Sequence, residues 1–149
     1  MKFRSYFPED RDQVISLWQR VLPDNQPHNE PSRVIDEKLS VDDMLFIAED
    51  KEVVVGVAMA GYDGHRGWLY SVAVDPQQRR NGIGRGLVNL AIQTLNNVGC
   101  IKINLQVRAT NVQVVEFYES LGFAIEDRIS MGKLLDQECS HKDLTGAKN

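Results

Sequence analysis

The residues best suited to chemistry lie in the run 75–87, Asp-Pro-Gln-Gln-Arg-Arg-Asn-Gly-Ile-Gly-Arg-Gly-Leu. A β-branched run at 68–74 precedes it and apolar residues at helical spacing follow, so the glycines occupy a strand-to-helix junction. The first turn of a helix offers unpaired backbone N–H groups and roughly half a positive charge, which suits an anionic oxygen. Gly82 and Gly84 lack a Cβ, so a ligand can approach their backbone closely. Positive charge is added by Arg79, Arg80 and Arg85. The run therefore predicts a phosphate-binding loop.

A Gly-x-Gly pair by itself also fits a tight turn whose glycines serve only packing. The pair is neither a Walker loop, because no Gly-Lys-Ser/Thr follows, nor a complete dinucleotide-binding fingerprint. The longer pattern is more specific: Val72-Ala73-Val74-Asp75-Pro76, then Arg79-x-x-Gly82-Ile83-Gly84 and Leu87. It resembles the acetyl-CoA motif of the GNAT N-acetyltransferase superfamily, Gln/Arg-x-x-Gly-x-Gly/Ala.

A second pattern is Asn111-x-x-Val114-x-x-Phe117-Tyr118-x-x-x-Gly122-Phe123. On a helix, Asn111 and Tyr118 share roughly one face. Taken singly, Tyr118 suits a core aromatic and Asn111 a helix cap. Together they resemble the GNAT motif Asn-x-x-Ala-x-x-Phe/Leu-Tyr-x-x-x-Gly-Phe. The resemblance extends over residues 44–131 and is closest to small bacterial RimI-like members.

The resemblance implies acetyl-CoA as cosubstrate and an amine as acceptor. Residues 79–84 would bind the pyrophosphate through backbone N–H groups, and Val72 and Val74 would pair their backbones with pantetheine. Asn111 would bind the pantetheine arm, and Tyr118 would protonate the departing thiolate as the catalytic acid. The implied cofactor-binding residues are Val72, Val74, Arg79, Arg80, Asn81, Gly82, Ile83, Gly84, Arg85, Asn111 and Tyr118.

The implied reaction is direct attack of a neutral amine on the thioester in a ternary complex, with backbone N–H near Val72 stabilising the oxyanion. Some family members carry a glutamate base close to the position of Trp68, which cannot act as a base. This departure suggests deprotonation through water. Asp63, His65 and Tyr70 are candidate helpers, although structural roles suit each of them as well.

Three functions therefore remain open. The first is an N-acetyltransferase, the second an acyl-CoA-binding sensor or regulatory domain with weak or no turnover, and the third a protein-interaction module whose glycine loop is structural. The acceptor pocket should draw on residues 24–31 and 62–67, where Glu30, Asp63 and His65 could favour a cationic amine or could simply be solvated. A protein N-terminus, a lysine, an amino sugar and a polyamine are all compatible acceptors, so the acceptor is either a small molecule or a protein or peptide.

Composition limits the partners. A net charge of −4 gives no global positive field for nucleic acid, and no apolar run is long enough for a signal peptide or a membrane helix. We therefore expect a cytoplasmic protein without nucleic-acid or membrane partners, and a homodimer is compatible with the sequence. Cys100 and Cys139 have no metal-ligand spacing, and the histidines, His28, His65 and His141, are scattered. No metal is expected.

The 149 residues suit one α/β (α+β) domain, residues 1–135, followed by a flexible tail, residues 136–149. We expect a GNAT-like mixed sheet of six or seven strands with helices on both faces and a parallel strand pair splayed at the acetyl-CoA site. Expected strands are 2–7, 44–48, 53–60, 68–74, 101–107 and 123–131. Expected helices are 8–22, a short one capped by Ser32, 82–98 and 110–121, whereas residues 24–31 should lack regular structure.

Overall fold

The computed structural model describes residues 1–135 of the chain. The chain divides into two compact units, Met1–Val115 and Glu116–Asn149, which we describe separately. The first unit contains the five strands found within the described residues. It also contains the strand-to-helix junction singled out in the sequence.

The first unit is built on one sheet whose strands follow chain order: β1 (Lys2–Ser5), β2 (Leu45–Asp50), β3 (Val53–Tyr62), β4 (Arg66–Val74) and β5 (Lys102–Asn104). Neighbours are antiparallel from β1 to β4, whereas β4 and β5 are parallel. The expected parallel pair is thus confirmed, and its connection contains a helix, as parallel strands require. Within residues 1–135 the sheet has five strands rather than six or seven.

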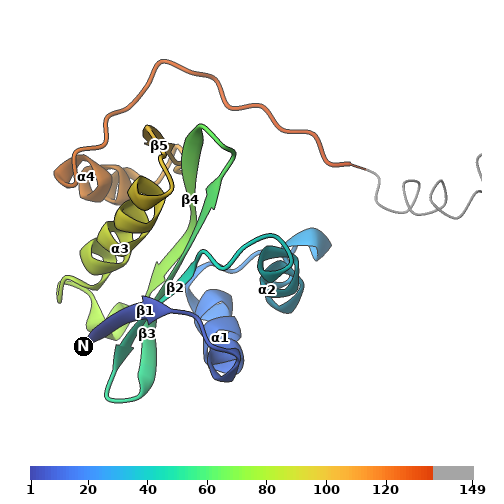
Figure 1. The fold of residues 1–149 in the computed structure, drawn as a ribbon, viewed down its shortest axis with the longest axis vertical. Coiled ribbons are helices and arrows are strands. Elements are labelled where there is room, and N and C mark those ends of the chain that lie inside the picture. The colour runs from blue at the N-terminus through green and yellow to red at the C-terminus, as the bar shows by residue number, and fades with distance from the viewer. Residues whose placement is uncertain (136–149) are drawn as a thin grey trace, which may run out of the picture. The chain divides into compact units, whose positions relative to one another are not determined.

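Helices cover both faces of this sheet (Figure 1). α1 (Arg11–Val21) and α2 (Pro31–Leu39) lie on one face, and α3 (Ile83–Asn97) lies on the other. Buried side chains from α1, α2 and three strands meet on the first face: Val14, Leu17, Trp18, Ile35, Leu45, Ile47, Val54, Val57 and Ala73. Because both faces are covered, β2 has a continuous apolar run in place of alternation.

The height of α3 above the sheet depends on a glycine. A Cβ added to Gly56 of β3 would lie 2.8 Å from Cγ2 of Ile83 and 2.9 Å from Cδ1 of Leu87. Ile83 is the first residue of α3 and is 1% exposed. The start of α3 therefore rests directly on the β3 backbone, which fixes where the preceding loop must lie.

A charged network ties the start of the chain to the sheet. Arg4 of β1 donates from Nη1 to Oδ2 of Asp10 at 2.8 Å and from Nη2 to Oε1 of Glu49 at 2.7 Å. Asp10 also accepts from the backbone N–H of Phe7 at 2.8 Å, and its side chain is only 7% exposed. Burial raises the pKa of the Asp10 carboxyl, but the hydrogen bonds from Arg4 and Phe7 outweigh burial, and the net pKa is lowered.

Two local expectations in the N-terminal half are wrong. The side chain of Glu30, not of Ser32, caps α2, because it accepts hydrogen bonds from the N–H groups of Ser32 and Arg33 while Pro31 occupies the first helical position. Residues 24–31 also contain a 3₁₀ turn, η2 (Pro27–Asn29). A proline at the first position of a turn has no N–H to lose, so it is compatible with this short helix.

The last expected strand is also wrong. α4 (Val112–Ser120) is followed by Gly122 at φ +95°, but residues 123–131 form no strand. Their alternation of apolar and polar residues predicts a half-buried strand, whereas Ile125, Ile129 and Met131 are 77%, 89% and 90% exposed. Alternation specifies a face and not a partner, and no described strand pairs with this segment. The expected tail, with Cys139 and His141, lies outside the described residues.

Candidate active site

The glycine loop has the geometry of an anion site. After β4, Asp75 closes a 3₁₀ turn, η3 (Pro76–Gln78), by accepting from the N–H of Gln77 at 3.0 Å. Gly82 then caps α3 in the left-handed conformation, with φ +75°. A Cβ added at Gly82 would meet nothing within 4 Å, so the backbone there borders open space. The first turn of α3 is therefore accessible to a ligand oxygen.

Charged and polar side chains surround that helix start. Arg79, Arg80, Asn81 and Arg85 are exposed, and Arg80 is itself held at φ +73°. A positive φ is uncommon for a residue with a side chain, and it occurs here next to the left-handed Gly82. These residues give the mouth of the loop a positive charge that matches a phosphate.

One edge of β4 lacks a strand partner just before this loop. Pairing between β4 and β5 ends at Trp68 and Asn104, so residues 69–74 have no strand beside them on that side within the described chain. The N–H of Asp75 donates to the carbonyl of Val55 in β3 at 2.9 Å. N–H directions alternate along a regular strand, so the amide of Val74 faces the unpaired edge. The parallel pair is thus open where pantetheine binding was expected.

The same stretch of β4 contains a bulge of which the sequence gives little sign. Met59 pairs with Tyr70 and Val57 with Ala73, so Ala58 faces two residues, Ser71 and Val72. Ser71 adopts φ +49°, which is rare for a residue other than glycine. Its carbonyl accepts a hydrogen bond from the indole Nε1 of Trp18 at 3.0 Å. The only sequence signal was a tryptophan on the apolar face of a helix, since a buried indole N–H usually has a partner.

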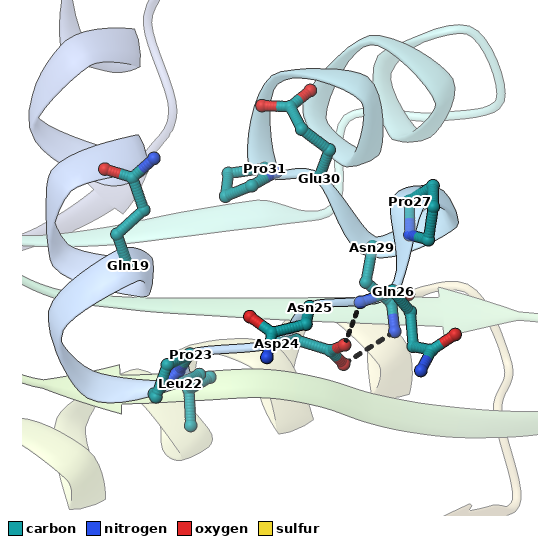
Figure 2. A pocket seen from close by; sticks show the side chains of 10 residues that line it. All are labelled: Gln19, Leu22, Pro23, Asp24, Asn25, Gln26, Pro27, Asn29, Glu30 and Pro31. Carbon is teal, nitrogen blue, oxygen red and sulfur yellow. Dashed lines mark hydrogen bonds between the residues drawn. The ribbon is translucent and has the colours of Figure 1, made fainter.

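A cavity of about 380 Å³ lies next to the end of α1 (Figure 2). It is lined by Gln19, residues 22–27 and residues 29–31. Asp24 accepts from the N–H of Gln26 at 2.8 Å and from Nδ2 of Asn29 at 2.7 Å, bonds drawn in Figure 2 that lower the pKa of its carboxyl. The hydroxyl of Ser32 and two backbone N–H groups lower the pKa of Glu30 in the same way. Both carboxylates are therefore anionic at neutral pH.

The three candidate helpers for amine deprotonation differ in surroundings. Asp63 accepts from the N–H groups of Arg66 at 2.7 Å and His65 at 2.9 Å, which closes the turn between β3 and β4 and lowers the pKa of its carboxyl. Asp63 is thus engaged in the turn and is a weak base. His65 is exposed in that turn. Tyr70 precedes the bulge, is 43% exposed and has its pKa raised by burial.

Asn111 and Tyr118 lie at the two ends of α4. Asn111 directly precedes the helix, donates its N–H to the carbonyl of Arg108 at 2.8 Å and accepts from the N–H of Val115 at 3.4 Å. Tyr118 belongs to the second unit, where its ring makes edge contacts with Phe117 at 5.0 Å and Phe123 at 5.6 Å. It is 9% exposed, and burial raises its pKa to about 12. The phenol therefore keeps its proton at neutral pH, as an acid catalyst must.

The structure thus brings together Val72, Val74 and the residues of the loop, which follow one another along β4, η3 and the start of α3. Cys100 is separate from them, because it precedes β5 while the loop follows the carboxyl end of the parallel strand β4. Among residues 1–135, no three His, Cys, Asp or Glu side chains are grouped so that they could hold a metal ion. No helix in this part of the chain has the length and apolarity needed to span a bilayer.

Comparison with known proteins identifies the same fold in several solved structures. A chain described as a transcriptional regulator from Bacillus halodurans C-125 superposes with a TM-score of 0.73 at 24% identity, over 89% of this chain and 99% of that one. Glucosamine-6-phosphate N-acetyltransferase from Arabidopsis thaliana gives 0.69 at 21% identity, over 91% and 98%. The aminoglycoside N-acetyltransferase AAC(6')-Iy in complex with CoA gives 0.74 at 19% identity, over 89% and 93%. The profile of the acetyltransferase (GNAT) family matches residues 11–123, and the chain belongs to that family.

Proposed function

We propose that the protein is an acetyl-CoA-dependent N-acetyltransferase that transfers the acetyl group to an amine by direct attack in a ternary complex. The pyrophosphate of CoA would bind at residues 79–84, and pantetheine would run along the unpaired edge of β4. Asn111 would contact the pantetheine arm, and Tyr118 would protonate the departing thiolate. A water molecule would take the proton from the attacking ammonium, because Trp68 stands where a carboxylate base would be needed.

One observation carries this proposal: the unpaired edge of β4 runs directly into a helix start capped by a left-handed glycine. The edge offers backbone N–H and C=O groups to an extended amide chain, in the manner of an added strand. The helix start offers N–H groups to phosphate a few residues further on. Pantetheine is an extended chain with two amides and ends in a pyrophosphate. Its amides and pyrophosphate therefore follow one another in the same order as the strand edge and the helix start.

The acceptor would enter through the cavity beside α1. Trp18 of that helix contacts the bulge in β4, while the neighbouring Gln19 lines the cavity, so the helix connects the two sites. The carboxylates of Asp24 and Glu30 make a cationic amine the favoured class of acceptor. Amino sugars, polyamines, lysine side chains and protein N-termini all carry such a group.

The test has a binding part and a turnover part. Calorimetry should detect CoA and acetyl-CoA binding to the wild type, and Gly84→Glu should abolish both, because a carboxylate would add bulk and like charge at the phosphate site. Turnover is followed as free thiol released from acetyl-CoA in the presence of a panel of amines. Undiminished CoA affinity in a folded Gly84→Glu protein would place the cofactor elsewhere.

The second candidate function is an acyl-CoA-binding sensor, which the tryptophan at position 68 favours because it leaves no carboxylate base there. The two candidates differ in turnover and agree in binding. A protein that binds acetyl-CoA tightly and releases no thiol with any amine tested would support the sensor. Amine-dependent thiol release would eliminate it.

A further inference from the structure

Strand pairing in the sheet does not explain why Ser71, in the bulge of β4, adopts φ +49°. A serine gains no intrinsic stability from the left-handed region, so the surroundings must impose that conformation. Its carbonyl accepts a hydrogen bond from the Nε1 of Trp18, a residue 53 positions earlier in the chain. Trp18 is 5% exposed and packs in the core formed by α1, α2 and the sheet, so its indole is firmly placed.

The hydrogen bond from Trp18 to the Ser71 carbonyl also fixes the orientation of the whole Ser71–Val72 peptide group. In a trans peptide the C=O of one residue and the N–H of the next lie in one plane and point in opposite directions. The carbonyl of Ser71 and the amide of Val72 form such a unit. Because the carbonyl of Ser71 accepts from the indole, the Val72 N–H points away from the indole, in a part of β4 that has no partner in β5. A hydrogen bond accepted at the carbonyl also polarises the peptide and strengthens its N–H as a donor.

We propose that Trp18 is a positioning residue for acyl transfer, whose indole N–H holds the Ser71–Val72 peptide so that the Val72 amide donates to the carbonyl oxygen of the acetyl thioester. This inference rests on the proposed function. It adds a residue of α1, on a separate element from the motif, to the machinery that aligns the acetyl group. A core tryptophan would otherwise serve packing alone.

The test compares the affinities of acetyl-CoA and CoA, since only acetyl-CoA carries the carbonyl. Trp18→Phe keeps an aromatic ring and removes the indole N–H. It should weaken acetyl-CoA binding by about three- to tenfold, the range expected for one hydrogen bond, and leave CoA binding nearly unchanged. Val14→Ala is the matched control, because Val14 is fully buried in the same helix and the same core and its side chain has no N–H to donate. Val14→Ala should lower the melting temperature without changing the affinity ratio, that is, the affinity for acetyl-CoA divided by the affinity for CoA.

A second pair of variants acts on the other end of the bond. Ser71→Gly adopts a positive φ without help, so adding it to Trp18→Phe should restore part of the acetyl-CoA affinity. Ser71→Val places a β-branched residue where positive φ is strongly disfavoured, and it should reduce the affinity ratio even with Trp18 intact. This variant carries the test if Trp18→Phe does not fold.

The outcomes distinguish a failure of the proposed function from a failure of the role of Trp18 alone. A wild type that binds neither CoA nor acetyl-CoA would overturn the proposed function, and this inference with it. A wild type that binds both, together with folded Trp18→Phe or Ser71→Val proteins whose affinity ratio equals the wild-type ratio, would overturn the role of Trp18 alone. A ratio lowered equally by Val14→Ala would also overturn it, because the effect would then come from core packing.

Discussion

Replacing Gly82 by alanine tests whether the left-handed cap of α3 is the conformation that binds CoA. Gly82 sits at φ +75° and a Cβ there meets nothing within 4 Å, so the substitution introduces backbone strain without a clash. Left-handed backbone costs an L-residue about 1–2 kcal/mol. For a chain of this size that corresponds to a fall in melting temperature of about 2–8 °C.

The same strain should appear in the affinity. If the free Gly82→Ala protein relaxes out of the left-handed conformation, CoA must restore it on binding, and the dissociation constant rises by about 5- to 30-fold. Gly99→Ala is the matched control, since Gly99 has φ +91° just beyond the other end of α3 and its added Cβ would lie 4.0 Å from the nearest atom, Oη of Tyr62. Calorimetry should find wild-type CoA affinity there, with a similar loss of melting temperature. Equal CoA affinities for Gly82→Ala and Gly99→Ala would refute the assignment of the loop conformation.

Three further predictions concern other parts of the chain. Tyr118→Phe should lower kcat by about 10²-fold or less while acetyl-CoA affinity changes little. Because the phenol pKa is about 12, the wild-type rate should show no loss from this group below about pH 10. An unchanged kcat in the variant would remove Tyr118 from the mechanism. Asp10→Asn should reduce the free energy of unfolding by about 1.5–3 kcal/mol at neutral pH. Because the folded-state pKa of Asp10 is depressed, this difference between wild type and variant is present above the unfolded pKa of about 4 and disappears as the pH falls through the folded pKa. Urea titrations at several pH values would measure it. Mass spectrometry should find no acetyl thioester on Cys100 during turnover, and an acetyl-Cys100 species that is consumed by acceptor would contradict direct transfer.

Much of the site was predictable because its physical signals are local. Gly82 takes a positive φ that glycine tolerates best, and Ile83, Leu87, Ala91 and Leu95 repeat at helical spacing and are buried on one face of α3. The parallel pairing of β4 and β5 follows from a helix lying between two strands. Each of these features depends on residues close together in the chain.

The features that were missed depend on partners distant in the chain or on a choice between neighbours. The carbonyl of Ser71 is bonded to Trp18 in another element, and no residue close to Ser71 in the chain predicts its positive φ. Glu30 and Ser32 both suit a helix cap, and Pro31 decides between them by occupying the first helical position. The alternation after Gly122 describes a strand that finds no pairing partner among the described residues.

The contact between Gly56 and Ile83 constrains how this chain can change over generations. Because a methyl group at position 56 would lie 2.8 Å from Ile83, any larger residue there pushes on the first residue of α3. Substitutions at the two positions should therefore be non-additive, and Gly56→Ala should be tolerated better together with Ile83→Val than alone. Among related sequences, the volumes at these positions should vary inversely. A change in core packing at β3 would then appear as covariation with the start of α3.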